Sequence, residues 1–538
     1  AIYLAWKYER SPEGFVRTSS KQSWRNPYKA SQRKPLTSKF IIAGMALIII
    51  VMYVYPRYLS TSEADEAADR ELTIEYKSIA ILPFVNMSGD LDMEPFCDGM
   101  TDAVISRLTK ITSLGKVISR TSMFKYKGTD KSVPEIANEL GVTHILESSF
   151  QKDGDKIKIN LQLIDATKDD HIWSMDYFDV FRDKFQIQAD VAENIARKMD
   201  VQITDIEIES IQKIPTNNED AYNLFLEAEF QRNKSNERSF ENAIPIYEQA
   251  ITLDSNFTDA YVCLAELWST GGLVWGIYDD QEAWRNANTL LQKALEIDST
   301  SIQIYNLLYA GYFYYDWNFD LVEKYYQAKL PQLITYRISA IEIDYAIKTG
   351  RYSEALSAIN KNISSDPSVG THYSFKAEIL MYLGKKDEAI HLLETADSLY
   401  SDDWVYLRAT AKLYYYLDEY EKSKNHLKKV MINFPDHPPI LLWLNAVYHH
   451  MDGNNEDVAR YLSELNEKYD EGPSGSPAWF IALYYCTLKD YENAFIWLQK
   501  SYDRHEVEMT WFKEEPLLIP LRNDPRYKDL YRKIGFPN

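Results

Sequence analysis

The sequence predicts a multidomain protein that has one transmembrane helix, a small α/β domain and a long all-α solenoid of helix pairs. Three observations support this fold class. An uncharged run covers 40–55, short β-branched segments alternate with helical ones between 77 and 203, and a helix-pair pattern recurs after 218. At 538 residues the chain is too long for one core, so several domains are expected.

The uncharged run is the predicted membrane span, which we place at 40–56. It is short, because a bilayer is typically crossed by about 20 residues and about 17 is near the minimum. Lys39 and Arg57 flank it and can extend their charged ends to the two interfaces. A buried core helix is the alternative, but the strongly polar flanks and the helix-ending Pro56 favour a membrane span.

The charge distribution orients this span. Residues 1–39 carry nine Lys or Arg against two Glu, a net +7, so a total of −21 leaves −28 for the rest. The positive-inside rule therefore predicts a cytoplasmic 1–39 segment and the bulk of the chain on the other side. An acidic body repels phosphate backbones, which argues against a nucleic-acid partner. The apolar start at 1–6 is interpreted as the end of an earlier membrane helix of a longer protein.

A polar linker, 57–76, leads to the α/β domain, 77–203. Apolar residues alternate with polar ones on both sides of the Asp153-Gly154 turn, and Asp-Gly between such runs predicts a hairpin. The expected order is β-α-β-α-β-β-β-α, with strands at 78–85, 116–120, 143–150, 156–164 and 171–177 and helices at 96–111, 133–140 and 185–201.

The segments ILPFVNMSGD, PFCDGMTDAVISRLTKI, ISRTSMFKYKG and IANELGVTHILESSFQKDGDKIKINLQLIDA resemble the TolB amino-terminal-like domain. That domain accompanies tetratricopeptide arrays in bacterial membrane proteins, including relatives of adenylate cyclases and CadC-like regulators. The resemblance implies a fold and the company of a tetratricopeptide array in a bacterial membrane protein. Together with the orientation given by the charges, we expect a protein of the bacterial inner membrane with the N-terminus cytoplasmic and the bulk periplasmic. It implies no catalytic residues.

The pattern after the 204–217 linker resembles the tetratricopeptide repeat. A small residue is followed four positions later by a large apolar one, and the small positions Ala355, Ala389 and Ser423 are separated by two equal steps of 34 residues. About eight helix pairs are expected over 218–505, followed by a C-terminal cap at 506–538. Each pair cannot bury its apolar face alone, so the pairs are expected to stack into a curved solenoid.

No catalytic pattern is found. GxSxG, HExxH and GxxxxGK[ST] are absent, and the three cysteines are far apart. His449 and His450 are adjacent, and neighbouring helical residues point about 100° apart, so they cannot ligate a metal from one face. The sequence therefore indicates a protein that is not an enzyme and needs no cofactor or metal.

The expected functional surface is the concave face, lined by the first helix of each pair. The repeat frame places on it Arg337, Asp344, Ser374, Glu378, Arg408, Lys412, Tyr415 and Trp479. We expect a protein or peptide partner there, held by a membrane-anchored periplasmic scaffold. The alternative is the sensory or regulatory part of a transmembrane signalling protein whose N-terminal portion lies outside this sequence. For each of these side chains taken singly, an ordinary solvated residue is the favoured interpretation.

Overall fold

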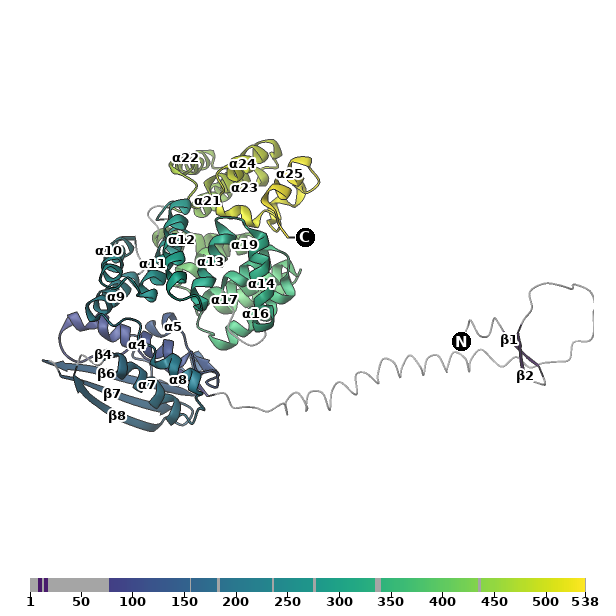
Figure 1. Ribbon diagram of the computed structural model, residues 1–538. Helices are drawn as coiled ribbons and strands as arrows, with labels where there is room; N and C mark the ends of the chain where they lie inside the picture. The colour runs from purple at the N-terminus through teal and green to yellow at the C-terminus, as the bar shows by residue number, and fades with distance from the viewer. Residues whose placement is uncertain are drawn as a thin grey trace, which may run out of the picture. The chain divides into compact units, whose positions relative to one another are not determined.

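The computed structural model describes residues 8–11, 14–17 and 77–537, except 155, 181–183, 235–236, 274–276, 334–339 and 434–436 (Figure 1). The chain divides into two compact units, Ala1–Glu75 and Tyr76–Asn538. In the first, β1 (Tyr8–Ser11) pairs antiparallel with β2 (Gly14–Arg17). The predicted membrane helix 40–56, the linker 57–76 and the segment 1–6 lie outside the described residues. Within the described part, no helix combines the length and apolarity that a membrane span requires.

The second unit begins with a mixed six-stranded sheet in the order β5-β3-β6-β7-β8, with β4 also pairing with β6. The central β3 is parallel to β5 and β6, whereas β6, β7 and β8 are antiparallel. The strands are β3 (Ser78–Ile81), β4 (Val85–Asn86), β5 (Lys116–Val117), β6 (His144–Asp153), β7 (Lys156–Asp165) and β8 (Asp170–Val180). The Asp153-Gly154 hairpin between β6 and β7 agrees with the sequence prediction.

Four helices complete this domain: α4 (Glu94–Leu108), α5 (Arg120–Phe124), α6 (Val133–Leu140) and α7 (Lys184–Lys198). The sequence missed the short α5. Every residue of β3 is buried, so both faces of the sheet are covered at its centre. Along β7 only alternate residues are fully buried, from Ile157 to Leu163, because one face of this strand packs on the core and the other carries polar side chains.

The segment 204–217, predicted as a linker, contains the helix α8 (Asp205–Gln212). The backbone carbonyl of Ile211 accepts a hydrogen bond of 3.1 Å from Arg107 Nε of α4, and the Ile211 side chain is 1% exposed. Sequence reasoning missed this contact, because the apolar content of α8 is concentrated in too few residues to form a continuous stripe.

The α/β domain shares its core with the start of the helical array. Helix α4 packs on α9 (Glu219–Arg232), where a Cβ atom at Gly99 would lie 2.4 Å from Leu226 Cδ2. Glycine at this position therefore permits the close approach of the two helices. One apolar cluster continues from the sheet through Tyr222 and Leu226 to Phe257.

The remainder of the unit is an array of helix pairs, as the repeat pattern predicts. The pairs are α9 with α10 (Glu237–Leu253), α11 (Thr258–Leu273) with α12 (Asp280–Ile297), α13 (Ile302–Tyr314) with α14 (Phe319–Leu333), α15 (Ala340–Lys348) with α16 (Tyr352–Ser365), α17 (Gly370–Tyr382) with α18 (Lys386–Asp397), α19 (Trp404–Tyr416) with α20 (Tyr420–Asn433), α21 (Pro439–Met451) with α22 (Asn455–Glu471), and α23 (Pro477–Thr487) with α24 (Tyr491–Asp503). The small frame residues Ala355, Ala389 and Ser423 are all fully buried.

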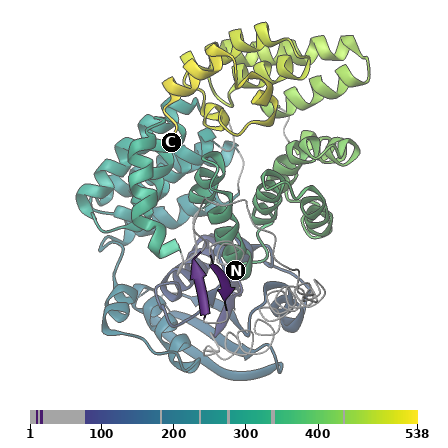
Figure 2. The same cartoon turned by 90° about the vertical axis from the view of Figure 1, so that its right-hand side faces the viewer.

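The C-terminal segment follows α24 as two 3-10 helices, η3 (Val507–Trp511) and η4 (Pro516–Leu521), and then α25 (Pro525–Ile534). It contacts early parts of the array. The ring centroids of Phe536 and Phe319 are 4.8 Å apart, and His505 stacks on Trp317 at 3.6 Å. In Figure 2 the yellow C-terminus accordingly lies beside the teal helices that include α14.

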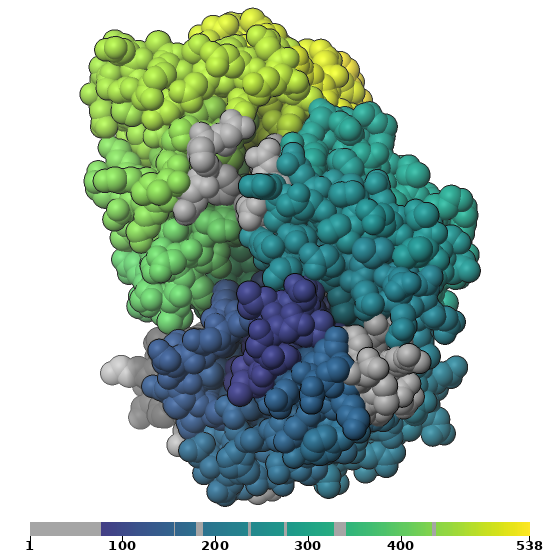
Figure 3. Space-filling view, turned by 90° about the vertical axis from the view of Figure 1, so that its left-hand side faces the viewer, coloured from purple at the N-terminus to yellow at the C-terminus, as the bar shows by residue number. Residues whose placement is uncertain are grey.

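The middle of the array also contacts the α/β domain. The fully buried Asp366, at the end of α16, accepts hydrogen bonds from Ser119 Oγ at 2.9 Å and Ser122 Oγ at 2.8 Å. Nearby, Lys125 Nζ donates to the carbonyl of Ser368 at 3.2 Å and lies 3.8 Å from Asp403. Figure 3 shows the blue α/β domain against both the teal start and the green middle of the array. We call the contacts around Asp366 the Asp366 clasp.

Candidate partner-binding face

The structure brings four of the predicted residues together on successive first helices. Asp344 belongs to α15, Glu378 to α17, and Arg408 and Lys412 to α19. We call these residues, with Lys348 of α15, the first-helix face. Arg337 lies outside the described residues. Whether this face binds a partner stays a prediction.

The first-helix face is not open, contrary to the sequence expectation. Residues 507–521, the two 3-10 helices and the turn between them, lie against it. The Lys348 ammonium lies over the Trp511 ring, 4.6 Å from its centroid, and the Lys412 ammonium lies 5.0 Å from the same centroid. Lys513 donates to the carbonyl of Thr349 at 2.9 Å.

Asp344 and Lys348 form a buried ion pair, one turn apart on α15. Lys348 Nζ lies 2.8 Å from Asp344 Oδ2, and the two side chains are 4% and 7% exposed. The same carboxylate oxygen accepts a hydrogen bond of 2.6 Å from Tyr314 OH. Such a pair is costly to break, because removing one partner leaves an uncompensated buried charge.

Lys412 forms the second ion pair of the face, and its partner comes from the C-terminal segment. Lys412 Nζ lies 3.7 Å from Glu515 Oε2, and the Glu515 side chain is fully buried. Tyr416 OH donates to Glu515 Oε1 at 2.5 Å. Tyr352 OH similarly donates to the carboxylate of Glu514. Acidic residues of the segment thus meet hydroxyl and ammonium donors of the array.

Glu378 lies among these charges. Burial raises the pKa of Glu378 to about 7, and Asp344 and Glu515 act in the same direction, whereas Lys412 and Lys348 oppose them. Burial also lowers the pKa of Arg408, against the attraction of Glu508. A carboxyl group with a pKa near neutrality can accept or release a proton under physiological conditions, so the charge of this face depends on pH.

Three predicted face residues belong to the interior instead. Trp479 is fully buried, and its backbone N–H donates to Glu506 Oε2 at 2.8 Å. Tyr415 packs edge-on against Trp443 with ring centroids 5.5 Å apart. Ser374 is 6% exposed and donates to the carbonyl of Thr371 at 2.9 Å. Placing these three side chains on an open face was wrong, because the fold buries all three.

Sequence reasoning missed Lys348 and the acidic, aromatic residues of the C-terminal segment. The run WFKEEP, residues 511–516, offered a signal of a binding segment, since it combines two adjacent glutamates with two large aromatic rings. Its location against α15 and α19 has no local signature, because the contacting residues are separated by about a hundred positions or more.

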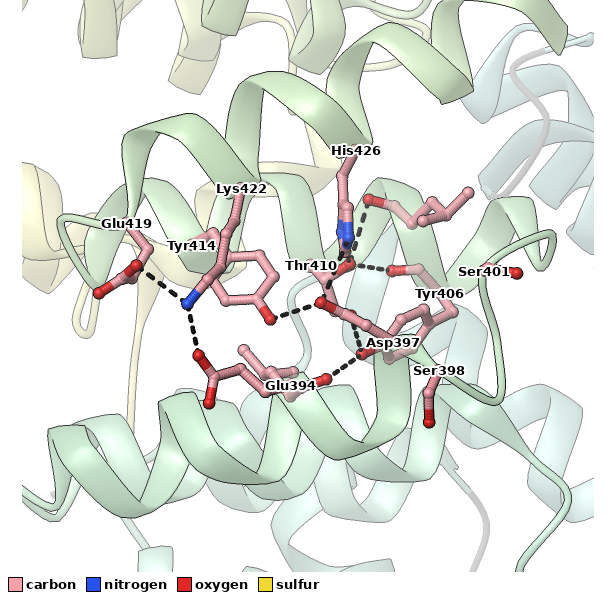
Figure 4. A network of polar contacts seen from close by, with 12 residues as sticks. Glu394, Asp397, Ser398, Ser401, Tyr406, Thr410, Tyr414, Glu419, Lys422 and His426 are labelled. Atoms are coloured by element: carbon pink, nitrogen blue, oxygen red, sulfur yellow. Dashed lines mark hydrogen bonds and ion pairs between the residues drawn. The ribbon is translucent and has the colours of Figure 1, made fainter.

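A second polar cluster lies between α18, α19 and α20 (Figure 4). Asp397 accepts hydrogen bonds of 2.7 Å from both Tyr406 OH and Tyr414 OH, and His426 Nε2 lies 3.5 Å away. His426 Nδ1 is 2.8 Å from Thr410 Oγ1. This order of hydroxyl, imidazole and carboxylate resembles a nucleophile with its base. Thr410 is fully buried, and its hydroxyl donates to the Tyr406 carbonyl at 2.7 Å. The cluster therefore stabilises the packing of α18, α19 and α20 and does not present a nucleophile.

In the described residues, no group of three or more His, Cys, Asp or Glu side chains is placed to hold a metal ion. The geometry defines a class: an α/β domain joined through a common core to an array of tetratricopeptide-like helix pairs. Its best-defined charged surface is covered by the chain's own C-terminal segment.

Comparison with known proteins finds a family match for the α/β domain and a relative for part of the chain. Residues 75–200 match the family described as "HilA/YgeH-like transcriptional regulator, second domain". A protein of Rhizobium meliloti (strain 1021), described as "Putative adenylate cyclase 3", is 33% identical over 188 residues, which is 35% of this chain and 32% of the relative. The chain thus matches about a third of the length of that relative.

Similar solved structures include the Cut9-Hcn1 hetero-tetramer of APC/C, with a TM-score of 0.32 and 15% identity over 66% of this chain and 85% of the other. A tetratricopeptide repeat protein from Parabacteroides merdae has a TM-score of 0.26 and 12% identity, covering 59% of this chain and 99% of its own. The assignment of helix pairs here rests on the observed helices and their spacing.

Proposed function

We propose that this chain is a membrane-anchored scaffold that holds a protein or peptide partner through its helical array. The observation that carries the proposal is that the first-helix face already holds a segment of the same chain, the two 3-10 helices and the turn of residues 507–521. The segment supplies Glu508, Glu514, Glu515 and Trp511 to a face that contains Lys348, Arg408 and Lys412. A partner segment of the same acidic, aromatic chemistry would use the same donors by exchanging with 507–521.

A peptide-exchange experiment tests this function. A labelled peptide copying residues 505–523 is titrated into the 538-residue chain and into a Glu515→Lys variant, whose own segment meets Lys412 with like charge. We expect the Glu515→Lys variant to bind the peptide more tightly than the parent chain does. A Lys412→Glu variant should bind a peptide that carries Glu515→Lys in preference to the parent peptide. Binding no stronger than that of a scrambled peptide in all three chains would contradict the proposal. Thermal melts establish that each variant is folded.

The anchored, periplasmic location is a separate part of the proposal, and it is supported by the +7 charge of 1–39 before the uncharged run. Asn454 is exposed at the start of α22 and accepts a test cysteine without burial. A membrane-impermeant maleimide should label Asn454→Cys once the outer membrane is permeabilised. Labelling only after lysis of the inner membrane would reverse the proposed orientation.

A regulatory role in transmembrane signalling is the second candidate. It is favoured by the α/β domain's similarity to the second domain of HilA/YgeH-like regulators, and by the similarity of 188 residues of the chain to a part of a cyclase-named protein. The Asp366 clasp and the shared core join this domain to the array, so a partner on the array could influence it. Sequencing the gene upstream of the codon for residue 1 distinguishes the two candidates. An effector domain encoded there would support signalling, and its absence would support a scaffold alone.

A further inference from the structure

The strand β8 forms one edge of the sheet. Among the described residues it pairs with β7 alone, over the whole length Asp170–Val180. A long edge strand presents a row of free backbone N–H and C=O groups, and proteins usually protect such edges with Lys, Pro or bulges. β8 contains neither Lys nor Pro, and its irregularity, opposite Leu163 and Ile164, lies near its start. The stretch 173–178 is therefore a regular edge.

The side chains of this edge divide between two faces. Trp173, Met175 and Tyr177 are half-buried on the face covered by α7, where Tyr177 OH donates to Asp190 at 3.1 Å. The opposite face is exposed and carries Phe178, 69% exposed, at one end of the stretch. Ile172, 42% exposed, lies at the irregularity just before the other end. An exposed phenylalanine at an unprotected edge favours contact with another protein surface.

The charge of the edge is compensated within its own sheet. Asp176 is the single acidic residue of 171–178. Its carboxylate lies 3.3 Å from Lys158 Nζ and accepts a hydrogen bond of 2.8 Å from Asn160, both on β7. The same Lys158 lies 5.4 Å from the ring centroid of Phe178. A second strand can therefore approach β8 without meeting an isolated charge.

We propose that β8 pairs antiparallel with β8 of a second copy of this chain, about a two-fold axis at Met175. An axis perpendicular to the sheet keeps the α7-covered faces of both copies on one side. It must then lie midway between one residue and the same residue of the second copy. Centring on Met175 opposes Ser174 to Asp176 of the second copy. It also opposes Trp173 to Tyr177, and Ile172 to Phe178, of the second copy.

Neighbouring registers are less favourable. An axis at Asp176 places the two Asp176 side chains directly opposite each other, and like charges in that position destabilise a sheet. An axis at Ser174 places the exposed Ile172 against Asp176 of the second copy. Of these three registers, only the one centred on Met175 places apolar residues opposite apolar ones and polar residues opposite polar ones. We therefore expect a single dimer, in which the two sheets form one continuous sheet.

Cross-linking of the 538-residue chain in mild detergent tests the axis. A Met175→Cys variant treated with a short bifunctional maleimide should give a covalent dimer, since directly opposed residues of an antiparallel pair are only about 4.5–5.5 Å apart. The control is Gln151→Cys, which is exposed on the sheet but lies on β6, two strands from the edge. The parent chain, with its three cysteines, sets the background. Equal dimer from positions 175 and 151 would overturn the proposal.

The register is tested by charge at Ser174. A Ser174→Lys variant opposes Lys to Asp176 twice in each dimer, and we expect its dissociation constant to fall by roughly two- to thirty-fold. Ser174→Asp should raise it by a similar factor. Gln151→Lys and Gln151→Asp change the net charge equally and should have little effect. A monomeric parent chain, or equal effects at positions 174 and 151, would refute β8 pairing, whereas peptide binding at the first-helix face is unaffected by either result.

Discussion

The Asp366 clasp offers the sharpest test of how the array is held against the α/β domain. Asp366 Oδ2 accepts hydrogen bonds from Ser119 and Ser122, which are more than 240 positions away, and Oδ1 accepts from Ser368 N–H and Oγ at 3.2 and 2.7 Å. We expect Asp366→Ala to cost about 3–4 kcal/mol, because each hydrogen bond to a charged group contributes about 1.5–3 kcal/mol. The buried Ser122 hydroxyl and the half-buried Ser119 hydroxyl also lose this acceptor.

Asp298 supplies a matched control. It ends α12 as Asp366 ends α16, and it makes the same local turn, with hydrogen bonds of 3.0 and 2.7 Å from Thr300 N–H and Oγ1. Its remaining partner is the exposed Lys213 rather than the hydroxyls of the half-buried Ser119 and the buried Ser122. We expect Asp298→Ala to cost only about 1 kcal/mol, since an exposed ion pair contributes at most that much. The difference between the two variants isolates the interdomain bonds.

Hydrogen exchange measured by mass spectrometry separates local from global effects. A loss of about 3 kcal/mol lowers the protection of the amides around α5 by roughly a hundredfold, whereas those of α23 and α24 should be unchanged. Equal loss in the Asp298→Ala variant, or unchanged protection over 119–126 in Asp366→Ala, would refute the role assigned to the clasp.

Three further predictions concern the array. Ala389→Phe should cost roughly 1–3 kcal/mol in thermal or denaturant unfolding, because Ala389 and Leu393 are fully buried, while Glu388→Phe on the exposed side should change stability little. Burial raises the folded-state pKa of Glu378 to about 7, so the protonated form of this residue favours the folded state. The free energy of unfolding should therefore fall as the pH rises from about 4.5 to 7. In denaturant titrations at several pH values, Glu378→Gln should flatten this dependence. Burial raises the pKa of Asp397, but hydrogen bonds from His426, Tyr406 and Tyr414 outweigh it and lower the pKa. The ionised carboxylate therefore stabilises the fold above the unfolded pKa, and this stability is lost as the pH falls through the lower folded value. Asp397→Asn should cost about 2 kcal/mol near pH 7 and less in acid, and an unchanged melting temperature would contradict this.

The order of the elements could be predicted from the sequence, because each depends on signals within a few residues. The Asp153-Gly154 turn and the alternation beside it specify the hairpin of β6 and β7. The 34-residue spacing of Ala355, Ala389 and Ser423 specifies helix pairs, since a small residue is required wherever two helices approach closely, and all three are buried as that reasoning requires. The short α5 escaped detection because five residues carry no measurable helical period.

The repeat frame assigns Asp344, Glu378, Arg408 and Lys412 to first helices, but the sequence could not decide that 507–521 covers them. Nor could it show that Trp479 and Tyr415 are enclosed by neighbouring pairs, or that Asp366 reaches Ser119 and Ser122. The physical reason is the same in each case. The rotation between successive helix pairs is small and accumulates along the array, so which distant segments meet depends on the summed packing of many side chains. Local periodicity determines the helices, and only the tertiary structure determines which of their faces stay exposed.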